Sequence, residues 1–200
     1  MVKYTQKQRK EVFSTMMGKS HLTVNGCVLA QAAAILRLDA CAPAREYIQA
    51  ALGATDIPSA LGAAAICIPL FLLGGILPDI DSPNSILGRK AHLPVTHHGI
   101  THTLWAALAL LALCFMKTPL IFLGLGYLFH LLADSLGAQG VAWFYPLTGY
   151  REYGGGAKVK KGHRIKLYRT GQMSETVCVM AVIAITISMA VITLIWQKPW

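Results

Sequence analysis

The sequence predicts an all-α, polytopic membrane protein with about five transmembrane or membrane-embedded helices around a His/Asp metal site. Charged residues make up 14% of the 200-residue chain, whereas they are about a quarter of soluble domains. Two runs, 57–77 and 176–196, carry no charge, and each is long enough to span a bilayer core. The net charge of +9 would also suit nucleic-acid binding, but so apolar a chain favours a membrane surface. We therefore expect no nucleic-acid partner.

The chain before Ile57 predicts a basic segment followed by one mildly apolar helix. Residues 1–20 carry five lysines and arginines against a single acid, and Leu22–Leu36 is an alanine-rich apolar run. A cleaved signal peptide is the competing interpretation, since a basic segment precedes an apolar one. We expect the apolar run to be the first membrane crossing.

The remaining apolar runs predict the other membrane helices. Ile57–Leu77 contains small residues that let a neighbouring helix approach closely, and Pro78 favours an end to the helix there. The runs His102–Met116 and Leu120–Leu136 are short, so they form either a tilted pair of spans or a hairpin buried among other helices. Thr176–Trp196 is the last predicted span.

The distribution of basic residues predicts the orientation of these spans. Lysine and arginine concentrate on the cytoplasmic side of membrane proteins. Five crossings from a cytoplasmic N-terminus place 14 of the 18 basic residues inside, and this count fails if the first run does not cross. The predicted parts are a basic cytoplasmic segment (1–20), a membrane-embedded helical domain (21–146), a basic cytoplasmic loop (147–174) and a C-terminal transmembrane helix (175–200).

Metal-ligand residue types cluster directly after the charge-free run 57–77. Asp79 and Asp81 stand two residues apart. His97 and His102 follow on either side of a glycine, which permits a turn that brings the two imidazoles together. Carboxylates and imidazoles suit a divalent ion such as zinc or manganese. The alternative for the aspartates is a cap that accepts hydrogen bonds from loop amides.

A second polar pair, His130 and Asp134, lies in an apolar helix. The i, i+4 spacing puts both side chains on one helical face. Ionisable residues in a membrane segment indicate a functional site by default, and a structural ion pair or helix cap is the alternative. The five-crossing topology places this pair on the same side of the membrane as the 79–102 stretch, so we expect the two groups to meet.

Three motifs carry a resemblance to a known family: DIDSPNSILGR (79–89), HHGITHT (97–103) and HLLAD (130–134). With these, residues 20–150 resemble the membrane-bound metal-dependent hydrolase family of the LexA-regulated YdjM type. The resemblance adds His21 and the stretch Gly140–Pro146 to the family pattern. It implies a bacterial inner-membrane protein that belongs to the SOS response. His98 stands where the family has arginine, and Thr103 where it has serine, so the charge of that arginine is missing here.

The residues and the resemblance together give seven candidate metal ligands. They are His21, Asp79, Asp81, His97, His102, His130 and Asp134. This set exceeds one tetrahedral zinc site, so we expect one or two ions of zinc or manganese. Asp81 and Asp134 are the candidate catalytic residues, because one aspartate could remain free as a general base. We interpret His98 as a support for a ligand, and His92 and His163 as solvated.

The predicted activity is hydrolysis of a phosphoester or ester in an amphipathic or lipid-like substrate, at the cytoplasmic face of the inner membrane, through a metal-activated water. The alternatives are a non-catalytic protein braced by a structural metal and a proton or metal transporter. Clustering of the ionisable groups at one end disfavours transport. We expect membrane lipids as partners, with anionic headgroups at Arg151–Arg169. The sequence leaves the oligomeric state open.

Overall fold

The structure is a computed structural model that describes residues 6–82, 85, 87–91, 99–137, 140–147, 150–153, 156–159, 167–169 and 171–196. Its α-helices are α1 (Gln6–Leu36), α2 (Ala42–Leu52), α3 (Ile57–Gly74), α4 (Gly88–Ala91), α5 (Leu104–Ala112), α6 (Ile121–Leu136) and α7 (Met173–Trp196). Short 3-10 helices are η1 (Asp39–Cys41), η2 (Pro78–Asp81), η3 (Ile100–His102), η4 (Leu113–Phe115) and η5 (Thr118–Leu120). The strands are β1 (Tyr150–Tyr153) and β2 (Gly156–Val159).

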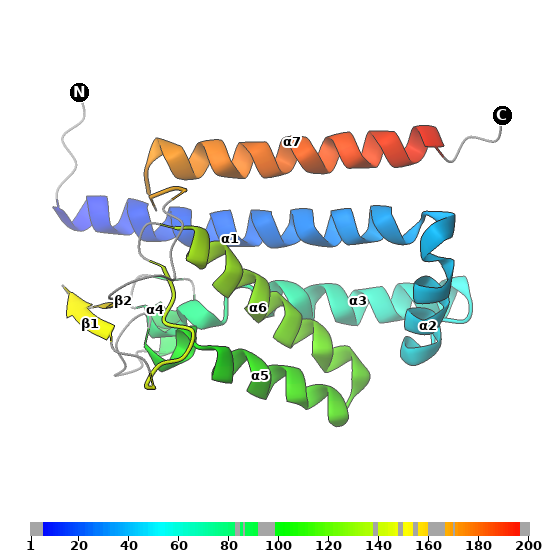
Figure 1. The fold of residues 1–200 in the computed structure, drawn as a ribbon, viewed down its shortest axis with the longest axis horizontal. Helices are drawn as coiled ribbons and strands as arrows, with labels where there is room; N and C mark the ends of the chain where they lie inside the picture. The colour runs from blue at the N-terminus through cyan, green and yellow to red at the C-terminus, as the bar shows by residue number, and fades with distance from the viewer. Residues whose placement is uncertain are drawn as a thin grey trace.

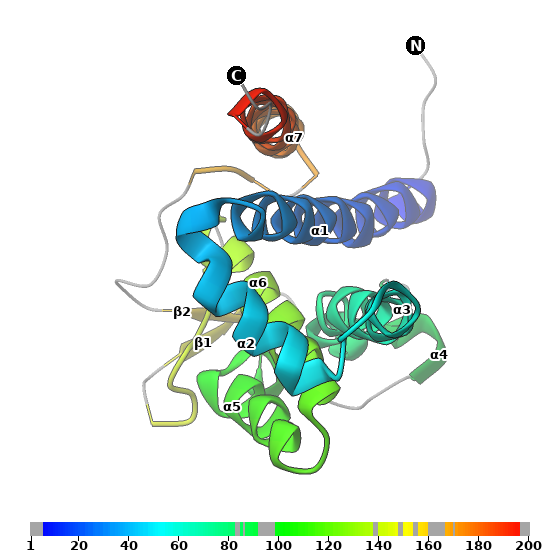
Figure 2. The ribbon, with the colours of Figure 1, turned by 90° about the vertical axis from the view of Figure 1, so that its right-hand side faces the viewer.

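The long helices run back and forth between two ends of the molecule (Figure 1). The helix α1 leads from one end to the other, α3 returns, α5 and α6 form a second excursion, and α7 runs out again. The helices α1 and α7 lie side by side, and α6 packs against both α3 and α5. Figure 2 shows α7 on the outer side of α1, with α3, α5 and α6 on its other side. This arrangement confirms the predicted all-α architecture.

Three stretches of the described chain are long and apolar enough to span a membrane. They are Ile57–Gly74, Thr118–Leu136 and Met173–Ile195. Large apolar side chains on α3 and α7, such as Leu61 and Ile187, are exposed. Extended apolar surfaces of this kind are rare in monomeric soluble proteins, and lipid tails would cover them.

Two helix boundaries differ from those that the sequence suggests. The helix α1 begins at Gln6, inside the predicted basic segment, and continues past residue 20. That segment contains no proline to interrupt it. The helix α3 ends at Gly74, before Leu77, and Gly75 is its C-cap. Two consecutive glycines weaken the helix there because glycine is a poor helix former.

A short antiparallel hairpin in the basic loop adds to the predicted helical fold. Strand β1 pairs with β2, with Tyr150 opposite Val159. The sequence predicted only a basic cytoplasmic loop in this region. The described residues Leu167–Arg169 then lead the chain back to α7, and the N–H of Leu167 donates to the carbonyl of Leu136 at 2.8 Å.

Close packing between α3 and α6 depends on glycine. A Cβ added to Gly74 would collide with the carbonyl oxygen of Leu123, and one added to Gly126 would collide with that of Phe71. This confirms that small residues let a neighbouring helix approach α3, as the sequence predicts. The contact fixes the C-terminal end of α3 against the N-terminal half of α6, about one helical turn before His130.

A hydrogen bond between side chains joins α1 to α7. The Gln31 amide donates to the Thr186 hydroxyl at 2.8 Å. In an apolar surrounding, such polar side chains hold helices together because they would otherwise lack partners. This bond sets the register of α7 along α1.

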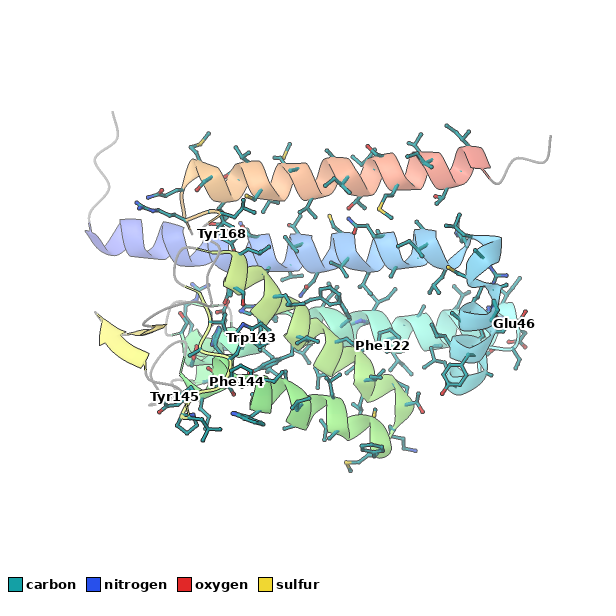
Figure 3. The ribbon with its side chains drawn as sticks, in the orientation of Figure 1. Glu46, Phe122, Trp143, Phe144, Tyr145 and Tyr168 are labelled. Carbon is teal, nitrogen blue, oxygen red and sulfur yellow. The ribbon has the colours of Figure 1, made fainter. Side chains whose placement is uncertain are left out.

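Aromatic side chains gather at the end of the molecule where α6 terminates. Trp143, Phe144 and Tyr145 lie there, whereas Glu46 of α2 lies at the opposite end (Figure 3). The Trp143 indole N–H donates to the Ser135 hydroxyl at 2.9 Å, and its carbonyl accepts from the N–H of Leu104 at 2.8 Å. The segment that contains Trp143 therefore ties the start of α5 to the end of α6.

Candidate metal centre

Four separate parts of the chain bring ionisable side chains together at one end of the helices. The middle of α1 supplies His21, η2 supplies Asp79, η3 supplies His102, and the C-terminal half of α6 supplies His130 and Asp134. Among them, His102 and His130 are fully buried, and the other three are almost so. Because water is excluded from most of the cluster, each charge depends on its neighbours for compensation.

Asp134 is the centre of the cluster. Its Oδ1 lies 3.2 Å from Nε2 of His21, and its Oδ2 lies 3.2 Å from Nε2 of His130. The same Oδ2 lies 3.5 Å from Nε2 of His102. One carboxylate therefore contacts three imidazoles that come from three different elements.

Asp79 forms the opposite side of the cluster. Its Oδ1 lies 3.7 Å from Nε2 of His130 and 3.8 Å from Nε2 of His102. The Asp79 carbonyl accepts a hydrogen bond of 2.5 Å from the Ser85 hydroxyl, and the Ser85 hydroxyl accepts one from the N–H of Gly88. The turn after η2 thus positions Asp79 through its backbone and leaves its carboxylate for the histidines.

The ring of His130 is held from behind by the end of α3. Its Nδ1 lies 2.8 Å from the carbonyl oxygen of Gly75 and must donate to it, because a carbonyl only accepts. This bond leaves Nε2 as the ring atom that can bind a metal, an arrangement usual in metal-binding histidines. His21 stacks on the other face of the ring, with centroids 3.9 Å apart.

Asp81 lies behind His102 rather than in front of it. Its Oδ2 is 3.4 Å from Nδ1 of His102 and accepts a hydrogen bond from the Thr101 hydroxyl. The Thr101 carbonyl in turn accepts from the Tyr127 hydroxyl of α6. A carboxylate at the rear nitrogen orients a histidine and leaves its Nε2 for a metal ion.

The distances within the cluster fit a metal ion. Ligand atoms about 2.1 Å from a tetrahedral ion are roughly 3.4 Å apart, and the five Nε2–carboxylate distances given above for Asp79 and Asp134 lie between 3.2 and 3.8 Å. Two sets of three meet within 4.8 Å: His21, His130 and Asp134, and Asp79, His102 and His130. The Nε2 atom of His130 faces the carboxylates of Asp79 and Asp134 and has no hydrogen-bond partner among the described residues. A divalent cation beside His130 would give these atoms a common partner.

The electrostatics of the η2 and η3 residues show how strongly the cluster attracts positive charge. Burial raises the pKa of Asp79, but His130 and His102 outweigh burial and hold it well below its usual range. Burial lowers the pKa of His102, but the carboxylates of Asp79 and Asp81 outweigh it and raise that pKa to about 10. His102 therefore holds a proton at neutral pH without a metal, and metal binding would release that proton.

Five of the seven predicted ligands converge. His21, His130 and Asp134 form one group and Asp79, His102 and His130 a second, so the two groups join at His130. Asp81 contacts the second group through the far nitrogen of His102. The seventh, His97, lies outside the described residues, as do His92, His98 and His163. The predicted meeting of the 79–102 stretch with the His130–Asp134 pair is thus present.

Three residues beside the cluster were not among the candidates that the sequence indicated. Asn25 is buried one helical turn after His21, and it packs against Gly75. Glu175 is 5% exposed, and its carboxylate accepts a 2.5 Å hydrogen bond from the N–H of Gly171. The Tyr168 hydroxyl donates to the carbonyl of Ala133 at 2.9 Å. The available signals were the i, i+4 spacing of His21 and Asn25 and the lone acid at the start of the last apolar run.

Comparisons with known proteins agree on one family. The family described as "YdjM inner membrane protein" matches residues 16–198. The curated protein "Inner membrane protein YdjM" from Escherichia coli (strain K12) is 39% identical over an alignment of 95 residues that covers 40% of this chain and 48% of that protein. The protein of the same name from Shigella flexneri matches with the same identity and coverage. The chain therefore spans about half the length of the curated relatives it matches, and no solved structure matches it.

Proposed function

This chain belongs to the YdjM family of inner membrane proteins, and from that premise we propose that it is a membrane-bound metal-dependent hydrolase. The proposed substrate is a phosphoester or ester of an amphipathic, lipid-like molecule. The family match and the apolar helices place the protein in the bacterial inner membrane. The reaction, its substrate and the cytoplasmic orientation of the site are parts of the proposal.

One observation carries the hydrolase proposal: a cavity reaches a metal-ligand candidate. The His21 side chain lines a cavity of about 220 Å³ between α1, α6 and α7, and the same ring lies 3.2 Å from Asp134. A metal that only braces helices is enclosed by protein ligands, whereas a catalytic metal keeps a position open. Access at His21 supports the catalytic alternative.

The donor set suits zinc or manganese, since it mixes imidazoles with carboxylates. A divalent ion bound there would lower the pKa of a water molecule and polarise the phosphoryl or carbonyl oxygen of the substrate. Both groups of three ligands share His130. Because its Nδ1 is bonded to Gly75, His130 offers one lone pair, so these five residues support a single ion. A second ion would need a bridging carboxylate.

The two candidate catalytic aspartates take different roles in this proposal. The Asp81 side chain is 0% exposed and is held by Thr101 and His102, so it orients His102. The Asp134 side chain is 10% exposed. A general base must reach the proton it removes, and exposure therefore favours Asp134 over Asp81 for this role.

The orientation of the site remains a proposal based on charge. The described start of α1, the β1–β2 hairpin and the metal cluster lie at one end of the molecule, and α7 ends at the other (Figure 1). We assign the first end to the cytoplasm because the strands β1 and β2, which belong to the basic segment of the sequence, lie there. Anionic lipid headgroups are the proposed partners of Arg151–Arg169. Reporter fusions at Lys160 and at Trp200 should give opposite sides, and the same side for both would contradict the five-crossing topology.

The activity test uses purified protein in detergent with phosphoester and carboxylic ester lipids. We expect metal-dependent release of product, and its loss in Asp134→Asn and Asp81→Asn variants that still contain metal. Ser188→Ala is the control, because Ser188 is exposed on α7 and its hydroxyl bonds only to the Ala184 carbonyl among the described contacts. If the unmodified protein contains metal but hydrolyses none of these esters, a structural metal that holds the helices together would explain the site better than catalysis.

A further inference from the structure

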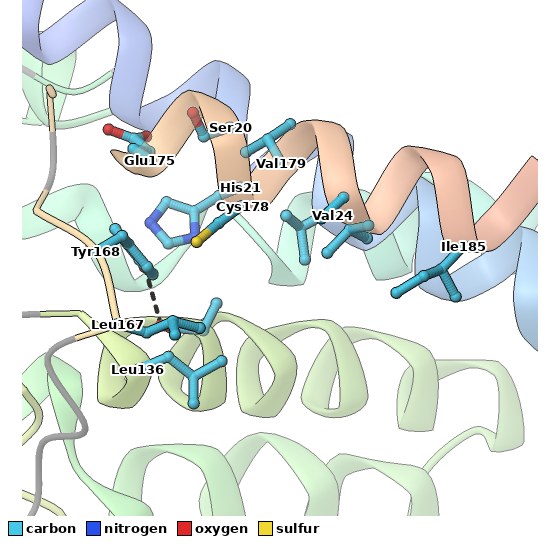
Figure 4. Close-up of a pocket in the computed structure, with 13 residues that line it drawn as sticks. Ser20, His21, Val24, Leu136, Leu167, Tyr168, Glu175, Cys178, Val179 and Ile185 are labelled. Atoms are coloured by element: carbon cyan, nitrogen blue, oxygen red, sulfur yellow. Dashed lines mark hydrogen bonds between the residues drawn. The ribbon is translucent and has the colours of Figure 1, made fainter. Parts of the chain in front are cut away.

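The cavity beside His21 has an apolar wall along two membrane helices. Figure 4 shows its lining residues, with Val24 on α1, Leu136 on α6, and Val179 and Ile185 on α7. Between Cys178 and Ile185 the lining follows α7 for about 10 Å, at 1.5 Å per residue. These residues lie inside the stretch Met173–Ile195, which is apolar enough to span a membrane. An occupant of this part must be apolar.

The other end of the same cavity is polar. The His21 ring and the Glu175 carboxylate lie there, close to Tyr168 (Figure 4). Glu175 is almost fully buried, although it carries an ionisable group. The cavity therefore changes from polar to apolar along the direction of the helices, as the bilayer does from its surface inward.

We propose that this cavity binds one hydrocarbon chain of a membrane lipid and so places the polar head of that lipid at His21. The inference rests on the proposed function, since it names the substrate as a lipid held by a chain in this cavity. Three observations support a hydrocarbon chain over other occupants. The wall consists mostly of aliphatic side chains, the surrounding medium is lipid, and the single polar end coincides with a metal-ligand candidate. A water-soluble ester would leave the apolar wall without a partner.

The first measurement locates the bound hydrocarbon chain directly. The full-length protein is reconstituted in phosphatidylethanolamine vesicles with phosphatidylglycerol that carries a diazirine midway along one acyl chain. After illumination, we expect labelled peptides to centre on the cavity walls, at 21–24 and 178–185. Labelling spread evenly over the exposed faces of α3 and α7 would mean adventitious lipid contact only and would overturn the proposal.

The second measurement fills the cavity. Val182→Trp places a large side chain in the wall, and Met180→Trp is the matched control because Met180 is 60% exposed on the same helix. We expect Val182→Trp to reduce cavity labelling about tenfold and Met180→Trp to leave it unchanged, a loss that corresponds to about 1.4 kcal/mol of binding free energy. Equal labelling in both variants would contradict the proposal. If Val182→Trp fails to fold, Val24→Phe fills the same cavity from α1.

A comparison of substrates separates this inference from the proposed hydrolase activity. Val182→Trp should raise KM for a long-chain lipid about tenfold and leave a short, water-soluble phosphoester unchanged, because only the former uses the apolar wall. If the unmodified protein hydrolyses neither compound, the hydrolase proposal fails, while the labelling pattern still decides whether the chain binds. If the unmodified protein hydrolyses both compounds and Val182→Trp slows both equally, the hydrocarbon-chain site is contradicted, while the hydrolase proposal stands.

Discussion

The two ends of α3 use aspartate in opposite ways. At the N-terminal end, the exposed Asp56 accepts a hydrogen bond from the N–H of Ser59, and the Ser59 hydroxyl accepts one from the N–H of Asp56. Just beyond the C-terminal end, the buried Asp79 faces two histidines that come from η3 and α6. The first arrangement needs four consecutive residues, and the second needs the whole fold. Loss of the second should therefore have the larger consequences.

The largest expected effect is loss of metal from the C-terminal end of α3. A double variant with Asp79→Ala and His130→Ala removes one carboxylate and the shared imidazole, so we expect metal content to fall to background. Asp56→Ala, at the other end of the helix, should keep the metal content of the unmodified protein. Elemental analysis of the purified proteins checks both. Equal metal in the double variant and the unmodified protein would remove the basis of the metal centre.

Chelation should have the next largest effect, on thermal stability. An ion that binds only the folded state at 1,000 times its Kd contributes about 4 kcal/mol. We expect chelator to lower the Tm of the unmodified protein and of Asp56→Ala equally, and to leave the double variant unchanged. Differential scanning calorimetry of the three proteins in detergent, with and without chelator, measures these Tm values. A Tm that changes neither with chelator nor with added zinc or manganese would indicate a hydrogen-bonded cluster without a metal.

Substitution of two glycines in α3 compares the two ends of the helix without changing a candidate metal ligand. Gly74→Ala should destabilise the protein by about 1–3 kcal/mol, which is typical of overpacking, because the added Cβ collides with the Leu123 carbonyl. Gly62→Ala, nearer the other end, meets nothing within 4 Å and should be neutral or slightly stabilising. Denaturant titrations of both variants provide the measurement, and similar losses would argue against the close contact of α3 with α6.

The smallest effect should come from the capping aspartate. Hydrogen bonds from Ser59 hold the pKa of Asp56 below its usual range, so its charged form is favoured in the folded protein. Its contribution is therefore complete above the ordinary aspartate pKa of about 3.9 and is lost as pH falls through the lowered folded value. We expect Asp56→Ala to lower Tm slightly at pH 7, with the difference from the unmodified protein vanishing in strong acid. A difference that grows as pH falls would contradict this sign.

The sequence predicted the elements that depend on composition. Runs without charge, such as 57–77, locate helices that contact lipid, and the spacing of His130 and Asp134 fixes one face of a helix. The meeting of these residues with Asp79 followed from topology alone, because all were assigned to one side of the membrane. The family resemblance supplied His21, and the structure places it in the cluster.

Other features depend on contacts between distant residues, which no local pattern contains. The position of Asp81 behind His102 rests on Thr101 and Tyr127. The cavity needs Tyr168 and Glu175 to approach α1 and α6, although the sequence around Tyr168 indicated only a basic loop. The start of α1 at Gln6 also could not be predicted from charge, since charged residues are compatible with a helix that extends beyond the apolar layer.

The bond between His130 and the Gly75 carbonyl affects the order in which a metal and a substrate can arrive. The C-terminal carbonyls of a helix carry about half a negative charge, and α3 directs its C-terminal end at the rear of His130. Together with the carboxylates of Asp79 and Asp134, this creates a negative potential that draws in cations and repels phosphate. An anionic head group therefore meets repulsion at the bare protein and attraction once a divalent ion is in place. Under the proposed function, binding should therefore be ordered, with the ion first and the lipid second.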